Sequence, residues 1–530
     1  MSRAKTRLFR GYGPIFAWIA AFLAMALLAP TVAPEKIVSR DQPGSTEPTV
    51  DEPLEGGSPT TQAAGVRRRT IAGAVSCPGP QIQGDPYSPQ CRQWSSADNG
   101  GATSQGVTGD TITITLRDTG PPYDIGSAIA QLTGERITAT VTKWDDIVRT
   151  YRTLIEYMNK RFQFYGRQLK LKTYEGQGSV VDEVLGGGQA GANADAIAAA
   201  QQHRAFADVS YEAPVFAEAL AKQKVISTNA IYPPKDFFAE NAPYVWAVLP
   251  DCTNLIRNLT GFLLKEVVGQ PVLAGEFAGK PRRIGAVVPD SPTYKKCGDL
   301  SAKLLKEAGH PFADVRYYRL SLDGIPNDAK DIASAFANEG ITTVVLGSDP
   351  LFPYFMTTTA QQSDWHPEWI VSGVAFQDAD FAGQLFEPHQ WRNAFGVSMT
   401  GAPVATRSSY GYTAYRSVDS ATSPVELIAD YIYGQLYLLA IGVHGAGPNL
   451  TPETFAQGMR AYRPARAAGP FGAWGFPDGE FSAPRDARII WWDPNETSTY
   501  NGSAGTYRDN GTRYPLGEFP AGPPAVSLTR

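Results

Sequence analysis

The sequence predicts an α/β protein of two lobes, each built on its own doubly wound sheet. Three observations favour this fold class: short β-branched strands alternate with helical stretches, the alternation restarts once, and the chain is long enough to bury a large core. Of its 530 residues, 43% are hydrophobic and 19% are charged. This balance is typical of a folded globular protein with polar appendages.

The first run of alternation begins near residue 106. Ile147, Tyr151 and Leu154 recur at helical spacing, which predicts a helix around them. Short runs rich in β-branched and aromatic residues predict the strands between the helices. The expected elements are strands at 111–116, 169–174, 206–209 and 224–227 and helices at 145–162, 194–203 and 214–222.

The same alternation restarts after an expected crossing at residues 244–250, which predicts a second sheet and hence a second lobe. Its expected elements are helices at 255–268, 294–308, 328–338 and 352–362 and strands at 283–288, 315–320, 342–346 and 369–372. The C-terminal third is less regular. There we expect strands at 394–399 and 487–492 and helices at 424–442 and 452–461, the last with Thr451 as its N-cap.

The N-terminus predicts export from the cytoplasm. Four basic residues precede the apolar run 15–29, and the first acidic residue, Glu35, follows it. By the positive-inside rule, the rest of the chain then lies outside the cytoplasm. The candidate cleavage sites at Ala29 and Ala33 each precede a proline. Residues 1–33 are therefore expected to be either a cleaved signal peptide or an N-terminal membrane anchor.

Two further segments precede the first strand. Residues 34–75 are rich in Pro, Gly, Ser and Thr and predict a disordered linker. Residues 76–105 are too poor in apolar side chains to fold alone, so we expect a disulfide to clip them. The four cysteines allow three pairings. The pairing that gives this segment its own clip is the favoured one: Cys77 with Cys91, and Cys252 with Cys297.

Composition and motifs argue against nucleic acid, metal and catalysis. The formal net charge is −5, and no basic block is large enough to follow a phosphate backbone. The cysteines and five histidines show no zinc-ligand spacing. Gly186, Gly188 and Gly191 satisfy G-x-G-x-x-G, but residues 175–185 separate them from the preceding strand, unlike a dinucleotide site. We expect no enzymatic activity, no cofactor and no metal.

Four stretches resemble the type I periplasmic solute-binding proteins, the family of the leucine/isoleucine/valine-binding protein, over about residues 106–494. They are GVTGDTITI (106–114), RRIGAVVPDSPTYKKCGDLSAKLLKEAGH (282–310), TTVVLGSDPLFPYFMTTTAQQSDWHPEWIVSG (342–373) and ELIADYIYGQLYLLAIGV (426–443). The resemblance implies a Venus-flytrap architecture, in which three crossings join two lobes around a solute cleft.

The resemblance also divides the chain into lobes. Lobe 1 is expected to comprise residues 106–248 and 374–468, and lobe 2 residues 249–373 and 480–494. Residues 495–530, rich in Asn, Gly, Thr, Tyr and Pro, are expected to form an irregular tail.

In this family, loops at the carboxyl ends of the parallel strands face the cleft, as expected for open α/β sheets. Matching those loops implies a set of ligand-binding residues, although Ser, Asn and Asp at such positions are also ordinary helix caps. The implied residues are Tyr123, Ser210, Tyr211, Thr228, Asn229, Ala230, Tyr294, Ser348, Asp349, Phe376 and Gln377.

One position departs from the family pattern. Amino-acid binders tend to have two small hydroxyl residues at the junction where this chain has Ser210, Tyr211 and Glu212. A ligand carboxylate beside Glu212 would be repelled. The departure leaves room for an amide, a polyol or an aromatic solute.

These features favour an extracytoplasmic receptor that captures a small polar molecule, such as an amino acid or an amide, by lobe closure. It would deliver the molecule to the permease subunits of an ABC transporter, and the membrane would be a further partner if residues 1–33 stay uncleaved. The alternative is a ligand-sensing or anchored binding module without a transporter. The long linker, and the lack of a cysteine for lipid attachment after the apolar run, favour that alternative.

Overall fold

The computed structural model describes residues 79–94, 98–121, 142–426, 428–464 and 471–528. These residues belong to one compact unit, 70–530, of the two into which the chain divides. The expected signal or anchor segment and the linker lie outside the described residues. So do Cys77 and Tyr123.

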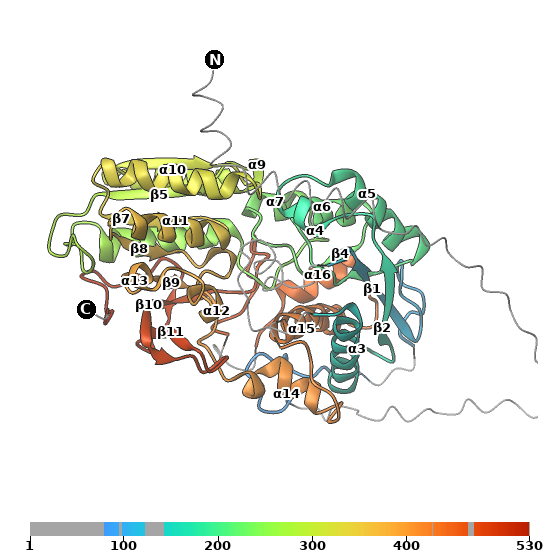
Figure 1. Ribbon diagram of the computed structural model, residues 1–530. Coiled ribbons are helices and arrows are strands. Elements are labelled where there is room, and N and C mark those ends of the chain that lie inside the picture. Colours follow the sequence, from blue (N-terminus) through green and yellow to red (C-terminus); the bar gives the residue numbers. More distant parts are fainter. Residues whose placement is uncertain (1–78, 95–97, 122–141, 427, 465–470, 529–530) are drawn as a thin grey trace, which may run out of the picture. The chain divides into compact units, whose positions relative to one another are not determined.

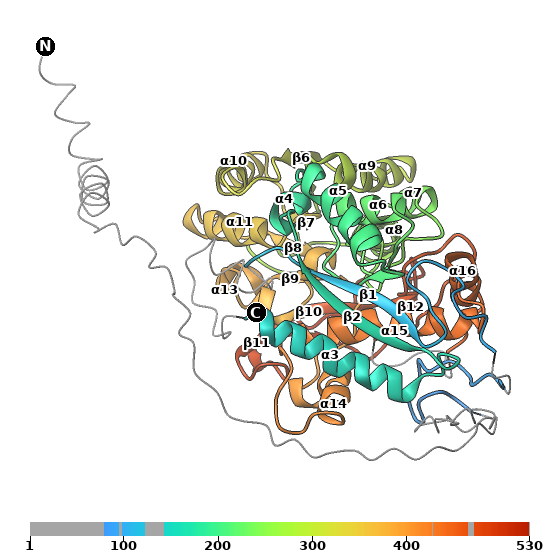
Figure 2. The ribbon, with the colours of Figure 1, turned by 90° about the vertical axis from the view of Figure 1, so that its right-hand side faces the viewer.

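Lobe 1 is built on a parallel sheet with the strand order β2-β1-β3-β4 (Figure 1). Its strands are β1 (Thr111–Asp118), β2 (Gln168–Glu175), β3 (Ala207–Asp208) and β4 (Ile226–Ser227). Its helices are α3 (Trp144–Arg161), α4 (Val180–Val184), α5 (Gln189–Ile197) with the π-helical turn η1 (Ala198–Gln202), α6 (Pro214–Lys222), α14 (Tyr410–Arg416), α15 (Ala429–Ala446) and α16 (Pro452–Arg460). The short helix α7 (Lys235–Glu240) lies in the segment that leaves lobe 1 after β4. Figure 2 shows α3 lying along β2, and α3 also packs against α15.

Lobe 2 is built on a larger sheet with the order β11-β10-β9-β8-β7-β5-β6, in which β12 also pairs with β10. Its strands are β5 (Ile284–Pro289), β6 (Asp314–Tyr318), β7 (Thr343–Leu346), β8 (Glu368–Val371), β9 (Ala394–Ser398), β10 (Asp486–Thr497), β11 (Ala504–Asp509) and β12 (Tyr514–Pro515). Strands β5 to β9 are parallel, and β10 runs antiparallel to β9.

The strand order of lobe 2 decides which helices share a face. The chain moves one way from β5 to β6 and back from β6 to β7 and β8. Right-handed crossovers therefore place α9 (Pro292–Glu307) on one face and α10 (Gly324–Asn338) and α11 (Leu351–Gln362) on the other. α8 (Cys252–Phe262), which continues into the π-helical turn η2 (Leu263–Val267), packs against α9.

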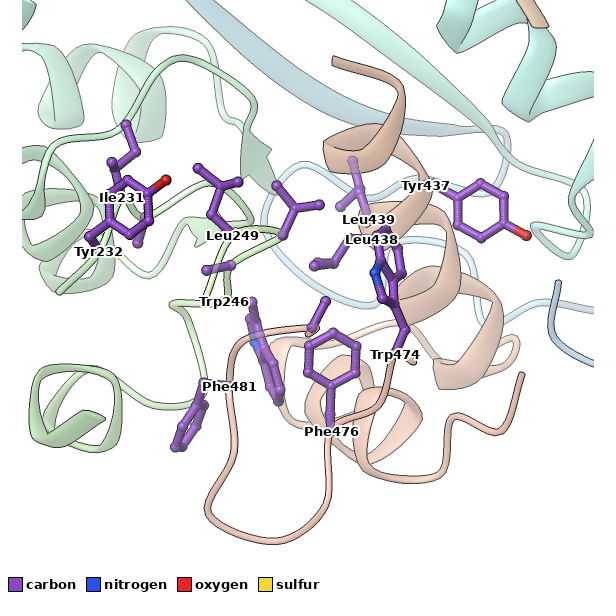
Figure 3. Packing of buried hydrophobic residues seen from close by; sticks show 14 of the residues in the cluster. Ile231, Tyr232, Trp246, Leu249, Tyr437, Leu438, Leu439, Trp474, Phe476 and Phe481 are labelled. Carbon is purple, nitrogen blue, oxygen red and sulfur yellow. The ribbon is translucent and has the colours of Figure 1, made fainter. Parts of the chain in front are cut away.

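Three segments cross between the lobes: residues 228–251, residues 399–409 and a third segment described at 461–464 and 471–485. The first and third run side by side, because the Ala247 N–H donates to the Phe481 carbonyl and the Ala483 N–H donates to the Ala247 carbonyl, both at 3.0 Å. Trp246 fixes them further by packing on Phe476 and Phe481, with ring centroids 5.7 and 5.3 Å away (Figure 3).

Two sequence-based assignments differ from this topology. The strand expected at 394–399 forms, but it lies in the sheet of lobe 2 rather than in lobe 1. Its five residues are all buried between β8 and β10, and a Cβ on Gly396 would lie 2.1 Å from the Val371 carbonyl oxygen. Hydrophobic patterning identifies such a strand but does not say which sheet it joins. The second crossing therefore follows β9, and 374–398 belongs with lobe 2.

The tail is also more regular than expected. The described residues 495–528 complete β10 and add β11 and β12. Asp380 fixes this region, because its carboxylate accepts hydrogen bonds from the hydroxyls of Ser498 and Thr506 at 2.6 and 2.8 Å and from the Tyr507 N–H at 2.8 Å. Polar side chains that satisfy a distant acid give no periodic signal, so the sequence reads as irregular there.

The expected Cys252–Cys297 disulfide is confirmed and joins α8 to α9, with 6.0 Å between the Cα atoms. Cys91 is also disulfide-bonded, and its predicted partner, Cys77, lies outside the described residues. The expected N-cap of α16 is confirmed as well, because the Thr451 hydroxyl accepts from the Thr454 N–H. Within the described part of the chain, no helix is long and apolar enough to cross a membrane.

Candidate functional site

A cavity of about 400 Å³ lies between the two lobes. In lobe 1 its walls come from the carboxyl end of β1 and from the segments that follow β3 and β4. In lobe 2 they come from the carboxyl end of β5 and from the segments that follow β7 and β8. This is where open α/β sheets place their ligands, because the loops at the strand ends meet there.

One side of the cavity is an aromatic wall formed by Tyr211, Tyr431, Phe376 and Tyr232. Neighbouring rings along this wall have centroids 6.4 Å apart, and Phe376 meets both Tyr431 and Tyr232 edge to face. Such edge-to-face pairs are favoured by the ring quadrupoles. Because Phe376 comes from lobe 2, Tyr211 and Tyr431 from lobe 1 and Tyr232 from the first crossing, the wall joins the two lobes.

A hydrogen-bonded network in lobe 1 supports the aromatic wall. The Tyr431 hydroxyl donates to the Asn229 side-chain oxygen, and the Asn229 amide donates to the Ser210 carbonyl at 2.9 Å. The Ser210 hydroxyl in turn accepts from the Arg117 N–H at 2.9 Å. These contacts fix the segments after β3 and β4 relative to α15.

Glu212 lies behind this wall, fully buried. One of its carboxylate oxygens accepts from the Ser227 hydroxyl and from the Asn229 N–H, and the other has no hydrogen-bond partner among the residues described. Burial, together with the nearby charge of Asp208, raises the pKa of Glu212 well above its ordinary value of 4.5. Glu212 does not line the cavity. The carboxylate that the sequence suggested would repel a ligand carboxylate therefore faces the interior of the lobe.

The raised pKa of Glu212 predicts a specific pH dependence of stability. Protons bind the folded state more tightly at this site, so its contribution is fully present below pH 4.5 and is lost as the pH rises through the folded pKa. The Glu212→Gln variant should lack this loss. Denaturant titrations from pH 4.5 upward should therefore give a flatter stability profile for the variant, which becomes relatively more stable than the wild type as the pH rises.

Glu480 provides a control of opposite sign. Burial acts to raise its pKa, but hydrogen bonds from Lys235, Asn254 and Arg485 prevail and lower the pKa to about 2. Its contribution to stability is present above pH 4.5 and is lost as the pH falls toward 2. Glu480→Gln should therefore be less stable than the wild type at neutral pH, with a difference that shrinks in acid. If the stability differences of the two variants from the wild type changed with pH in the same direction, this account would be contradicted.

Arg117 is the only basic side chain lining the described part of the cavity, and buried acids already neutralise it. Its guanidinium lies 2.6 Å from a Glu183 carboxylate oxygen and 3.1 Å from one of Asp195, and it stacks 3.4 Å above the Phe216 ring. These side chains are almost fully buried. Arg117 therefore holds Glu183, Asp195 and Phe216 together beside the cavity, and its guanidinium is not free to bind an anion.

On the lobe 2 side, Asp349 is occupied in the same way. Its carboxylate accepts from the Tyr318 hydroxyl and from the N–H groups of Leu351 and Phe352, at 2.8 and 3.1 Å. Burial raises the pKa of Asp349. The carboxylate thus satisfies the first turn of α11, which is the ordinary role of an acid at a helix start.

The structure brings most of the predicted site residues to the cavity. Those that line it are Ser210, Tyr211, Asn229, Tyr294, Ser348, Asp349 and Phe376. Their contact with a ligand remains a prediction. Three others do not line the cavity: Thr228, Ala230 and Gln377.

The residues that miss the cavity have structural positions. Gln377 is fully buried and donates to the Ser348 carbonyl at 2.6 Å, which ties the segment after β8 to the segment after β7. Thr228 and Ala230 are buried beside β4. Phe376 and Gln377 were expected just after the second crossing, but they precede β9 and belong to lobe 2.

Sequence reasoning missed the apolar part of the lining. Four residues come from α4 and its end, and four come from lobe 2 near the starts of α10 and α11. They are Val180, Val181, Val184, Leu185, Leu320, Leu322, Ile325 and Leu351. A signal was available, because α4 directly follows β2 and nearly all its residues outside the acidic pair are apolar.

No group of His, Cys, Asp or Glu residues in the described ranges could hold a metal ion. In the G-x-G-x-x-G stretch, Gly186 and Gly188 lie between α4 and α5, and Gly191 lies in the first turn of α5. The stretch is thus away from the end of a strand.

No protein-family model matches the chain, and no curated protein matches it. Solved structures resemble it. A solute-binding protein of an ABC transporter from Rhodopseudomonas palustris BisB5, in complex with 3,4-dihydroxybenzoic acid, has a TM-score of 0.53 at 10% identity, covering 77% of this chain and 98% of its own. A leucine-, isoleucine-, valine-, threonine- and alanine-binding protein from Brucella ovis, in a closed conformation, has a TM-score of 0.51 at 13% identity, covering 79% and 100%.

A fatty acid ABC transporter substrate-binding protein from Thermomonospora curvata has a TM-score of 0.50 at 15% identity, covering 78% of this chain and 97% of its own. In each case nearly the whole of the solved chain is matched. The two sheets, the three crossings and these similarities all indicate the same fold. The chain has the two-lobed α/β fold of the type I periplasmic binding proteins.

Proposed function

We propose that this protein is an extracytoplasmic receptor that captures a small molecule between its lobes and delivers it to an ABC transporter. The cavity lined by strand ends of both sheets is the observation that carries this proposal. A ligand held there contacts both lobes only when they are closed, so its binding free energy favours the closed state. A transporter can then distinguish loaded from empty receptor by shape.

Three further observations support this function. The Cys252–Cys297 disulfide suits an oxidising compartment outside the cytoplasm. The buried acids beside the cavity, Glu212 and Asp349, are engaged by hydrogen bonds and are not poised as an acid–base pair. The similar solved proteins are named for ligands as different as an aromatic acid, amino acids and a fatty acid, which fits one scaffold with interchangeable loops.

The test is a ligand screen by thermal shift, followed by hydrogen exchange on the full chain. The probes are leucine, glutamine, sorbitol, dihydroxybenzoate and n-decanol. A specific ligand at 100 times its Kd should stabilise the protein by about 2.7 kcal/mol. It should also protect the backbone after β3 in lobe 1 and after β7 in lobe 2 together. Protection confined to one lobe would contradict closure around the ligand.

A matched pair of tyrosines tests the site itself. Tyr294 lines the cavity at the start of α9, so Tyr294→Ala should weaken binding of the ligand found by at least about tenfold. Tyr317 lies on β6 outside the lining and bonds Asp299, so Tyr317→Ala should bind as the wild type does. Equal losses in the two variants would place the ligand elsewhere.

The alternative is an anchored or secreted sensor that works without a transporter, which the long linker expected at residues 34–75 favours. Uptake by cells that lack the protein distinguishes the two. Loss of uptake of the radiolabelled ligand supports the transporter receptor. Normal uptake with a lost response to the ligand supports the sensor.

A further inference from the structure

We infer that the cavity selects an uncharged, largely apolar molecule with a single hydroxyl or carbonyl group, rather than an amino acid. This inference rests on the proposed receptor function and names the class of its ligand. It follows from three properties of the cavity: its charged groups, its free hydroxyl groups and its apolar mouth.

Among the described residues, the cavity offers no free cation for a ligand carboxylate. Arg117, the sole basic side chain lining it within the described residues, is held by Glu183 and Asp195. Burying an unpaired carboxylate is strongly unfavourable.

In its described lining, the cavity offers no free anion for a ligand amine either. Asp349 is the sole acidic side chain that lines it in the described ranges, and Tyr318 and the first turn of α11 already occupy its oxygens. A zwitterionic amino acid would therefore leave both of its charges unpaired. This is the physical reason for rejecting the amino acid and for choosing an uncharged ligand.

Two tyrosine hydroxyl groups are available for a neutral polar group. Tyr211 and Tyr294 line the cavity from opposite lobes, and within the described part of the chain neither hydroxyl takes part in a hydrogen bond. Burial raises the pKa of Tyr211 to about 12, so this hydroxyl stays protonated and can donate. A ligand hydroxyl or carbonyl oxygen would accept these hydrogen bonds without bringing a charge.

Most of the rest of the lining is apolar, and this apolar part reaches the surface. On the lobe 1 side, α4 presents Val180, Val181 and Val184, while Glu183 of the same helix binds Arg117 and so fixes the helix orientation. On the lobe 2 side, Leu322 lines the cavity with 41% of its surface exposed. Exposed apolar side chains beside a cavity are typical of binding grooves. This apolar mouth suits a hydrocarbon chain.

The first experiment uses n-decanol, decanoate and decylamine, which share one hydrocarbon chain and differ in the charge of the end group. Isothermal titration calorimetry on the full chain should show n-decanol binding at least about tenfold more tightly than either charged probe, and no binding of leucine. Tighter binding of decanoate would overturn the inference in favour of an anion site. Binding of leucine in preference to n-decanol would restore the amino acid.

The second experiment uses two exposed residues as a matched pair. Leu322 lies in the loop between β6 and α10, and Val404 lies in the second crossing. Each is 41% exposed, but of the two only Leu322 lines the cavity. Leu322→Asp should weaken n-decanol binding by about tenfold, whereas Val404→Asp should leave it unchanged. Both variants should keep the melting temperature of the wild type. Equal affinities of the two variants for n-decanol would show that the apolar mouth does not contact the ligand.

The two levels of the proposal fail differently. If polar or charged solutes bind and protect both lobes while n-decanol does not bind, the receptor function stands and the apolar ligand class is wrong. If no probe of any class binds and no protection appears in either lobe, the receptor function itself is contradicted.

Discussion

Replacing Arg117 by leucine is expected to lower the free energy of unfolding by about 3–5 kcal/mol. The substitution removes the only cation that pairs with the buried carboxylates of Glu183 and Asp195 in the described structure. Burial raises the pKa of Glu183 even with Arg117 present, so without it this acid faces a larger desolvation cost. Urea denaturation at neutral pH, followed by circular dichroism, measures the change.

The control is a surface arginine. Arg149 pairs with Asp146 one helical turn away, with both side chains about 40% exposed, and such pairs contribute at most about 1 kcal/mol. Arg149→Leu should therefore be nearly neutral. A triple variant that also replaces Glu183 and Asp195 with apolar residues should regain much of the stability lost in Arg117→Leu, because no unpaired charge remains. A small loss in Arg117→Leu alone would contradict the role assigned to the triad.

The Cys252→Ala/Cys297→Ala double variant is expected to lose about 4 kcal/mol of stability in the chain-entropy model. The bond closes a loop of 45 residues and ties α8, which follows the first crossing, to α9, which carries Tyr294. Opening this loop increases the entropy of the unfolded chain. Guanidinium denaturation under oxidising conditions compares the variant with the wild type.

Reductant separates this bond from the one at Cys91. Reducing the wild type breaks both bonds, whereas reducing the double variant breaks only the bond at Cys91. The difference between these two reduced states should be small, since neither retains Cys252–Cys297. A large difference, or a double variant as stable as the oxidised wild type, would contradict the stabilising role of the α8–α9 link.

Much of the fold could be predicted because its elements carry local signals. The helix expected at 214–222 forms with the same bounds as α6, which begins at a proline in the first turn, and the buried strands β1, β5 and β7 lie within two residues of their predicted positions. The sheet to which β9 belongs could not be predicted. Its partners, β8 and β10, are buried apolar strands like most others, and only the close approach at Gly396 distinguishes the pairing.

The site could be predicted only in part, for a different reason. The strand-end rule placed Ser210, Tyr211 and Tyr294 at the cavity. It did not show that Phe376 faces the cavity while the adjacent Gln377 is buried away from it. That difference depends on the left-handed backbone at Ala375 and Phe376, with φ of 50° and 62°, a conformation uncommon for residues with side chains. No local sequence signal encodes this turn.

The sequence predicted a polar ligand, whereas we propose a largely apolar one from the structure. The two differ because the sequence-based prediction considered polar loop residues and not the valines of α4. Polar residues at strand ends are the usual candidates for ligand contacts. The side chains of Asn229 and Asp349, however, already form hydrogen bonds to neighbouring parts of the protein. Whether a side chain is already engaged is a tertiary property. It could not be deduced from the residue type.

The hydrogen bond from the Tyr507 hydroxyl to the Gln377 carbonyl, 2.6 Å long, joins residues 130 positions apart. Ribosomes make the chain from its N-terminus, so the loop bearing Phe376 is synthesised well before the hairpin of β10 and β11 that holds it in place. The loop bearing Phe376 therefore gains this hydrogen bond only after β11 has been synthesised. A chain that ends before β11 lacks this hydrogen bond and the support that it gives to the loop bearing Phe376.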